Sequence, residues 1–142
     1  MYSRNIAELE EKIRKQEMTL GPDHPDLADN VVRLAHLCFI FNRYAQAESL
    51  YWKAVTIRSR VFGHEHLSVS GLLNDLGLLY QIQLQYAEAE HVFRLAYAIK
   101  AANFGSSHDE ALGAARNVVA VCRAQQKHIS ETELERMARV AI

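Results

Sequence analysis

The sequence predicts an all-α fold, in which antiparallel helix hairpins stack on one another. Two observations support this prediction. Apolar residues recur at helical spacing along most of the chain, and the whole pattern recurs every 42 residues (63−21 and 105−63), an interval that we call the repeat period. Glycines and histidines mark this period, at Gly21, Gly63 and Gly105 and at His24, His66 and His108. With only two prolines and six glycines in the chain, we expect long, uninterrupted helices.

The clearest copy of the pattern lies in residues 72–96, where small and large apolar residues alternate at helical spacing. A polar break at Gln83 and Gln85 separates two helices, and Gly77 and Ala89 stand where those helices must approach closely. The expected hairpins cover residues 25–41 with 45–60, 67–83 with 87–102, and 109–125 with 131–141.

The middle copy reads Leu76-Gly77-x-x-Tyr80, then Tyr86-x-x-Ala89-x-x-x-Phe93-x-x-Ala96, and this signature resembles the tetratricopeptide repeat. The repeat period and the opening Leu20-Gly21-Pro22-Asp23-His24-Pro25 resemble the longer kinesin-light-chain variety of that repeat. The resemblance covers residues 20 to about 130. It implies a right-handed superhelical solenoid in which the first helix of each hairpin lines the concave side. Such a resemblance is specific for fold and not for function.

We expect one domain over residues 1–142, with a capping helix at 1–20, repeats at 21–62 and 63–104, and a degenerate third repeat with a C-terminal cap at 105–142. In the first of these segments, Ile6, Leu9, Ile13 and Leu20 fall on one stripe that Gln16 interrupts. This stripe favours a cap on the first hairpin. The alternative is a short coiled-coil seam between two copies of the protein.

The third copy departs from the pattern in its second helix. Glu131 and Glu135 stand where the other copies have alanine and an aromatic residue, and a charge cannot fill a buried aromatic position without a large cost. Ser130 and Glu133 have the spacing of a capping box, so a helix is still expected. Its inner face would use Leu134, Met137 and Ala138, with the outer face in water.

Composition narrows the classes of function. A formal charge of −1 gives no reason to expect nucleic acid or an anionic membrane as a partner. Cys38 and Cys122 stand two repeats apart, too far for a disulfide, so both are expected to be reduced packing residues. The N-terminus lacks the apolar core of a signal peptide, and the longest apolar run is 37–41. We therefore expect a soluble, cytoplasmic protein.

The histidines invite a metal hypothesis, especially in His64-Glu65-His66. The zinc-protease signature needs two histidines one helical turn apart, whereas these are two positions apart in an expected loop. The recurring histidines are instead expected to cap or pack at the corners between repeats. Ser106-Ser107-His108 has a local capping explanation, and the glycines are single and do not form a phosphate-binding loop. No enzyme activity, metal or cofactor is expected.

By the resemblance, the first helices would line a groove for a peptide or short helix of a partner protein. Apolar residues on that side lie off the packing stripes, and exposed apolar patches usually mark binding surfaces. Asn74 matches an asparagine that, in the kinesin-light-chain family, hydrogen-bonds the backbone of an extended peptide. The predicted groove residues are Val32, His36, Phe39, Ile40, Asn74, Leu78, Gln81, Ile82, Arg116 and Arg123.

Within this set, Asn74 and Gln81 would hold the ligand backbone, and Arg116 with Arg123 would favour acidic neighbours. The remaining affinity would come from apolar contacts of Phe39, Ile40, Leu78 and Ile82. A chaperone-tail clamp is rejected, because Val32 and His36 occupy the positions of its cation and asparagine. The sequence thus predicts a non-catalytic adaptor or scaffold. The alternative is a self-assembly module, in which the groove or the terminal helices pair between copies.

Overall fold

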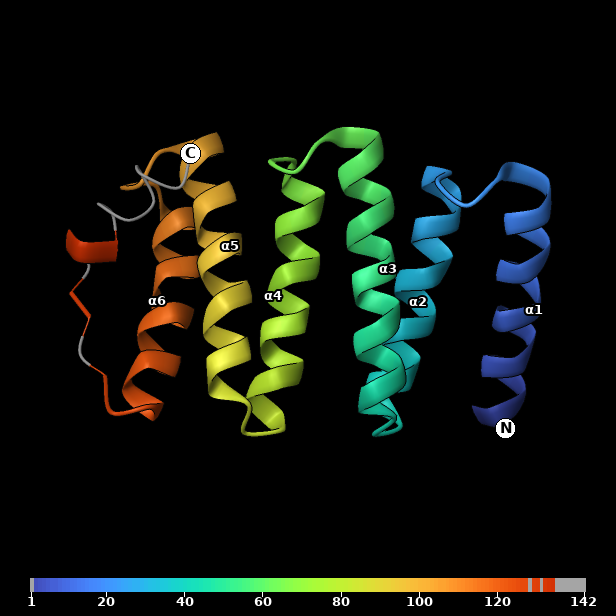
Figure 1. Cartoon of the computed structure of the whole chain (residues 1–142), viewed down its shortest axis with the longest axis horizontal. Helices are drawn as coiled ribbons and strands as arrows, with labels where there is room; N and C mark the ends of the chain where they lie inside the picture. The colour runs from blue at the N-terminus through green and yellow to red at the C-terminus, as the bar shows by residue number, and fades with distance from the viewer. Residues whose placement is uncertain (1, 128, 131, 135–142) are drawn as a thin grey trace. The chain divides into compact units, whose positions relative to one another are not determined.

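The computed structural model describes residues 2–127, 129–130 and 132–134, with side chains from residue 4 onward. Six long helices lie within this part of the chain (Figure 1). They are α1 (Tyr2–Leu20), α2 (Pro25–Ile40), α3 (Tyr44–Phe62), α4 (Leu67–Ile82), α5 (Tyr86–Phe104) and α6 (Asp109–Ala124). The bounds of α2 to α6 agree closely with the predicted hairpins, and the predicted class of antiparallel helix hairpins is confirmed.

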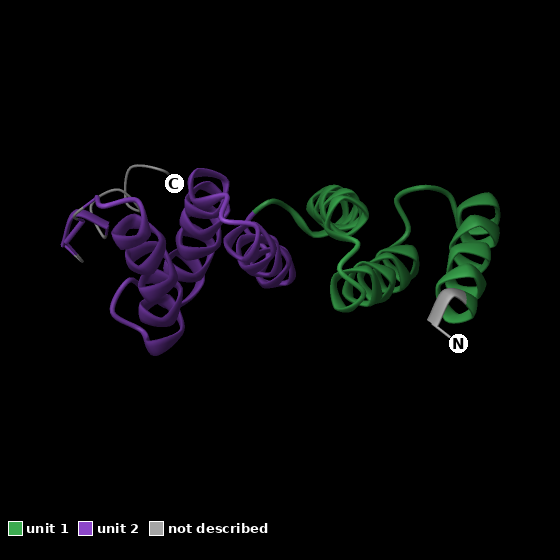
Figure 2. Cartoon of the chain, turned by 90° about the horizontal axis from the view of Figure 1, so that it is seen from below, with its two compact units in different colours: residues 1–64 green, residues 65–142 purple. Residues whose placement is uncertain are grey.

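The chain divides into two compact units, residues 1–64 and residues 65–142 (Figure 2). The first unit contains α1, α2 and α3, and the second contains α4, α5 and α6. Each unit has its own packed apolar side chains, and each is described by itself below.

In the first unit, α2 and α3 form the hairpin and α1 packs against α2. Ile6 and Ile13 of α1 are buried, so they are not available for a seam with a second copy, whereas Leu20 is exposed. Gln16, the interruption in the stripe, accepts a hydrogen bond from Asn30 Nδ2 at 2.6 Å. Lys53 of α3 also forms an ion pair with Glu17 of α1. The N-terminal helix therefore covers the first hairpin, as predicted.

In the second unit, α5 packs against both α4 and α6. α4 approaches α5 closely at Gly77, where a Cβ would lie 2.6 Å from Cδ1 and Cζ of the buried Phe93 ring. Since no side chain fits at that distance, the small residue is what allows the ring to lie against the α4 backbone. Ala89 is also fully buried, which confirms the predicted small-residue positions.

The turn inside each hairpin has one residue in the left-handed region of φ. These residues are Asn42 (φ 60°), Leu84 (φ 61°) and Gln126 (φ 61°). The N–H of the following residue closes each turn by donating to a carbonyl near the end of the preceding helix, as Gln85 does to Tyr80 at 2.9 Å. The turns that follow α1, α3 and α5 use Gly21, Gly63 and Gly105, with φ of 88°, 94° and 93°.

Beyond α6, the predicted capping box is present. Ser130 Oγ accepts from the Glu133 N–H at 3.2 Å, and Glu133 Oε2 accepts from the Ser130 N–H at 3.0 Å. Residues 132–134 are helical and Leu134 is buried. The predicted roles of Glu131, Glu135, Met137 and Ala138 lie outside the described residues.

Candidate functional site

Histidine caps begin the three helices that carry the predicted groove residues. The Nδ1 atoms of His24, His66 and His108 each accept a backbone N–H at 3.1 Å, from Asp26, Ser68 and Glu110 respectively. Each bond satisfies one of the N–H groups that a helix leaves without a partner in its first turn. The predicted capping role of the recurring histidines is confirmed.

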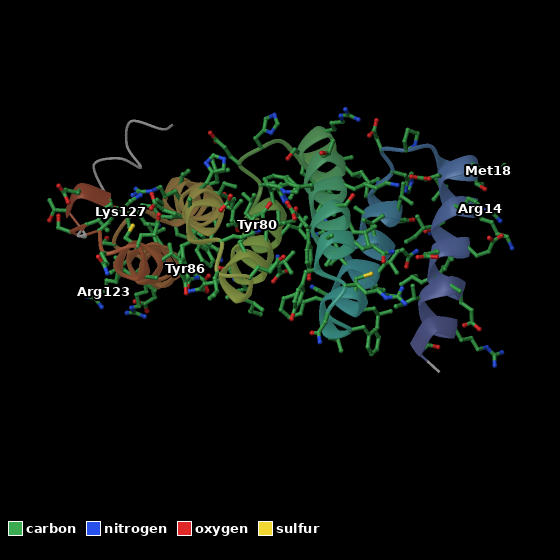
Figure 3. The ribbon with its side chains drawn as sticks, turned by 60° about the horizontal axis from the view of Figure 1, so that its bottom comes forward. Arg14, Met18, Tyr80, Tyr86, Arg123 and Lys127 are labelled. Carbon is green, nitrogen blue, oxygen red and sulfur yellow. The ribbon has the colours of Figure 1, made fainter. Side chains whose placement is uncertain are left out.

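Six predicted groove residues lie on α4 and α6 in the second unit. On α4, Asn74 and Gln81 are half-buried, whereas Leu78 and Ile82 are 41% and 51% exposed. On α6, Arg116 and Arg123 are exposed, and Figure 3 shows Arg123 projecting from the helix. Exposed apolar side chains on α4 are therefore present together with exposed cations on α6.

An open cleft of about 320 Å³, the α4–α6 cleft, is lined by α4, α5 and α6, and of the predicted groove residues Asn74 alone lines it. Gly71 of α4 and Gly113 of α6 both line it, and no atom lies within 4 Å of where a Cβ would stand at either position. The two glycines, one repeat period apart, therefore leave open space that larger side chains would fill. The cleft gives a ligand access to the backbone of both helices.

Two asparagines meet in the α4–α6 cleft. Asn117 Nδ2 of α6 donates to Asn74 Oδ1 of α4 at 2.8 Å, and both side chains are half-buried. This bond leaves the amino group of Asn74 as a donor and Oδ1 of Asn117 as an acceptor, neither with a partner in the described part of the chain. A donor next to an acceptor matches the carbonyl and N–H of a peptide group.

The far end of the α4–α6 cleft is charged. Lys100 Nζ of α5 lies 2.6 Å from Glu110 Oε2 of α6, and its hydrogen bond and charge lower the pKa of the Glu110 carboxyl. Asp109 also lines this end of the cleft. The ring of Phe104 stacks on His108 with the centroids 4.8 Å apart. Two carboxylates and one ammonium group therefore border the end of the cleft at the N-terminus of α6.

The other four predicted groove residues lie on α2 in the first unit. Ile40 is 64% exposed, whereas Val32 is half-buried. Phe39 is also half-buried, because its ring packs edge-on against Tyr44 with the centroids 5.9 Å apart. His36 is exposed and lies edge-on to Tyr51 at 5.6 Å. On this helix, Ile40 presents more apolar surface to solvent than Phe39 does.

The predicted set omitted five polar residues of the α4–α6 cleft: Ser70, Lys100, Asp109, Glu110 and Asn117. Asn117 corresponds to Asp75 of the preceding copy, a position that the groove prediction did not use. The groove prediction omitted Lys100 because it considered only the first helix of each hairpin. A basic residue, Arg58, stands at the equivalent position one repeat period earlier, and this recurrence is a sequence signal for Lys100. Arg58 Nη2 donates a hydrogen bond to Asp29 Oδ1 at 3.0 Å. In the second unit Gly71 stands at the position of Asp29, so no carboxylate is present there for Lys100.

Within the described residues, no three His, Cys, Asp or Glu side chains lie together in a way that could hold a metal ion.

None of the helices in the described ranges is both long enough and apolar enough to cross a membrane.

Comparison with known proteins decides the family. The tetratricopeptide repeat model matches residues 29–102, which is more than half of the chain. The chain belongs to the tetratricopeptide repeat family. Its curated relatives include the human (Homo sapiens) clustered mitochondria protein homolog, which is 27% identical over 78 residues. That match covers 55% of this tetratricopeptide repeat chain and 6% of the relative.

Solved structures share the fold of this tetratricopeptide repeat chain. The crystal structure of BtubC (BKLC) from P. vanneervenii has a TM-score of 0.79 at 20% identity, over 99% of this chain and 57% of that one. A putative kinesin light chain of Podospora anserina with nearly identical TPR-like repeats has a TM-score of 0.77 at 23% identity. That match covers 98% of this chain and 66% of the other. The resemblance to repeats of the kinesin-light-chain type is thus confirmed in the fold.

Proposed function

We propose that this chain is a non-catalytic binding module, an adaptor or scaffold that holds a peptide or short helix of a partner protein. Tetratricopeptide repeats are protein-interaction folds, which supports the general role. The observation that carries the specific proposal is the Asn74–Asn117 pair in the α4–α6 cleft. The pair keeps one donor and one acceptor for a ligand, so it can hold a peptide backbone whatever the ligand's side chains are.

The surroundings of the asparagine pair suit a peptide. Leu78 and Ile82 offer exposed apolar surface one and two helical turns beyond Asn74, and half-buried Gln81 adds a second amide on the same helix. Burial of this apolar surface would supply affinity, while the amides fix the ligand backbone. Arg116 and Arg123 would favour acidic residues in the ligand.

In the first unit, α2 offers a separate set of contacts in the proposal. Exposed Ile40 would supply the apolar contact there, and Val32, His36 and Phe39 would border it. Because Phe39 already packs against Tyr44, we assign it a smaller share of the binding energy than Ile40. The variants Ile40→Glu and Leu78→Glu therefore test the two units independently.

The experiment captures partners from source lysate with the parent chain and with Asn74→Ala, and then measures the affinity of the identified peptide by calorimetry. We expect Asn74→Ala to weaken binding on the order of tenfold, because a peptide hydrogen bond is lost in a partly desolvated site. His91→Ala is the matched control, since His91 is exposed on α5 and does not line the α4–α6 cleft. Circular dichroism confirms that each variant is folded.

Equal peptide affinity of the parent and Asn74→Ala would contradict the proposal. The same holds for the alternative outcome, in which the chain captures only itself and its mass rises with concentration. That result would identify a self-assembly module.

We also propose a reducing compartment, the cytoplasm, for this chain. Cys38 and Cys122 are free and buried, and burial raises the pKa of both thiols. Buried thiols with raised pKa values are poor nucleophiles, which suits packing residues that never form disulfides.

A further inference from the structure

The N-terminal helix has the register of a second helix of a repeat. α1, α3 and α5 are each 19 residues long, and they begin one repeat period apart, at Tyr2, Tyr44 and Tyr86. The turn after each of them has a glycine with positive φ, followed by a histidine cap. In sequence register, α1 therefore corresponds to α5, and α2 corresponds to α6.

In the second unit, α4 fills the corner between α5 and α6. Phe93 of α5 packs on Gly77 of α4, and Asn117 of α6 bonds Asn74 of α4. Ala96 of α5 lines the α4–α6 cleft beside Asn74. These contacts define the position that the first helix of a hairpin occupies, against the second helix of its own hairpin and the first helix of the next hairpin. We call this position the seat.

In the first unit, the same corner is an open cleft of about 490 Å³, which we name the α1–α2 cleft. The residues that correspond to Phe93, Ala96 and Asn117 are Leu9, Lys12 and Arg33, and all three line it. Its other lining residues are Asn5, Glu8, His36 and Leu37. No described element of the chain occupies this seat.

The α1–α2 cleft has an apolar floor and two cations without partners. Leu9 and Leu37 are half-buried and supply the floor. Glu8 is paired with Arg4 at 3.0 Å, whereas Lys12 and Arg33 make no ion pair or hydrogen bond within the described residues. A ligand that brings carboxylates to Lys12 and Arg33 would therefore gain charge-assisted hydrogen bonds.

We propose that the α1–α2 cleft binds an amphipathic helix of a partner protein that carries two carboxylates one turn apart. The spacing follows from α4, where Ser70 and Asn74 lie one turn apart and line the cleft that Ala96 and Asn117 also line. A helix seated in the same way would place carboxylates at these two positions opposite Lys12 and Arg33. Its apolar face would cover Leu9 and Leu37. This surface is separate from the proposed peptide site on α4 and α6.

The test uses the full chain and fluorescently labelled peptides with the sequence of α4. The acidic peptide carries Ser70→Glu and Asn74→Glu, and the basic peptide carries Ser70→Lys and Asn74→Lys. By fluorescence anisotropy, we expect saturable binding of the acidic peptide that weakens as salt rises. Lys12→Glu with Arg33→Glu in the chain should lower that affinity by about tenfold or more and should create binding of the basic peptide.

The control variant is Lys15→Glu with Arg43→Glu, which makes the same change in net charge at two exposed residues that line neither cleft. It should bind the acidic peptide as the parent does, which would show that the loss in Lys12→Glu with Arg33→Glu is specific to the α1–α2 cleft. Absence of saturable binding, equal binding of both peptides, or loss of binding in the control would overturn the proposal. A doubled mass of the parent chain that Lys12→Glu with Arg33→Glu abolishes would also overturn it, because the occupant would then be a second copy.

Discussion

At the scale of the residue, Leu84 adopts a left-handed backbone conformation, which residues with a Cβ atom rarely adopt. Its φ is 61°, and the side chain is 70% exposed, so little packing offsets the strain. The equivalent residue of the first hairpin is Asn42, a type that tolerates this conformation. We expect Leu84→Asn to raise the free energy of unfolding by about 0.5–1 kcal/mol, measured by urea titration.

Leu84→Ala is the control for that prediction. Alanine removes most of the exposed side chain but keeps Cβ, which is the source of the strain, so it should not reproduce the gain. If Leu84→Ala stabilises the chain as much as Leu84→Asn does, the gain comes from the lost side chain and the strain argument is wrong.

At the scale of the element, α5 and α6 are joined by a polar cluster around Glu90. The Glu90 carboxylate accepts from Arg94 Nε at 2.9 Å and from Gln125 Nε2 at 2.8 Å, and Lys127 Nζ lies 3.4 Å away. Partial burial alone would raise the pKa of Glu90, but these hydrogen bonds and the charges of Arg94 and Lys127 outweigh it, so the pKa is lowered.

A lowered pKa in the folded state gives a stability contribution that is present above the unfolded pKa and is lost as pH falls through the folded pKa. We expect Glu90→Gln to lower the free energy of unfolding by about 1–2 kcal/mol at pH 7. The difference from the parent should shrink below about pH 4.5, the ordinary value for a glutamate. Urea titrations between pH 3 and pH 7 measure it; Glu88→Gln, exposed on the same helix, should follow the parent. A constant difference across this range would refute the electrostatic explanation.

The element scale also separates what the sequence could predict from what it could not. The helix bounds followed from glycines and histidines at fixed spacing and from proline at the start of the first hairpin, because these residues set local backbone and capping geometry. We did not predict that α1 has the register of a second helix. At the positions where α3 and α5 have alanine, an aromatic residue and alanine, α1 has Asn5, Leu9 and Lys12. A sequence signal for the relation is the recurrence of tyrosine at the repeat period, at Tyr2, Tyr44 and Tyr86. The bounds of the folded helix, one repeat period before those of α3, make it plain.

At the scale of the whole molecule, the fold was predictable and the site was predictable in part. Three copies in register specify helix hairpins, since each copy must bury its apolar stripe against the next. Asn74 was predicted, but its partner Asn117 occupies a different position in its own copy, so periodicity could not pair them. The pairing depends on where α6 packs against α5, which is a tertiary property.

The second unit contains, within residues 65–142, all the contacts that define the α4–α6 cleft. Gly77 meets Phe93, Asn74 meets Asn117, and Asn103 Nδ2 of α5 donates to the Glu65 carbonyl at 2.8 Å. We therefore expect residues 65–142 alone to fold, with helical circular dichroism and a cooperative thermal transition, although so short a domain buries only about 60% of its unfolded surface. Residues 86–142 are the matched control, since they lack α4 and leave Phe93 uncovered; they should melt without cooperativity. A non-cooperative transition for residues 65–142 would mean that this unit needs residues 1–64 to fold.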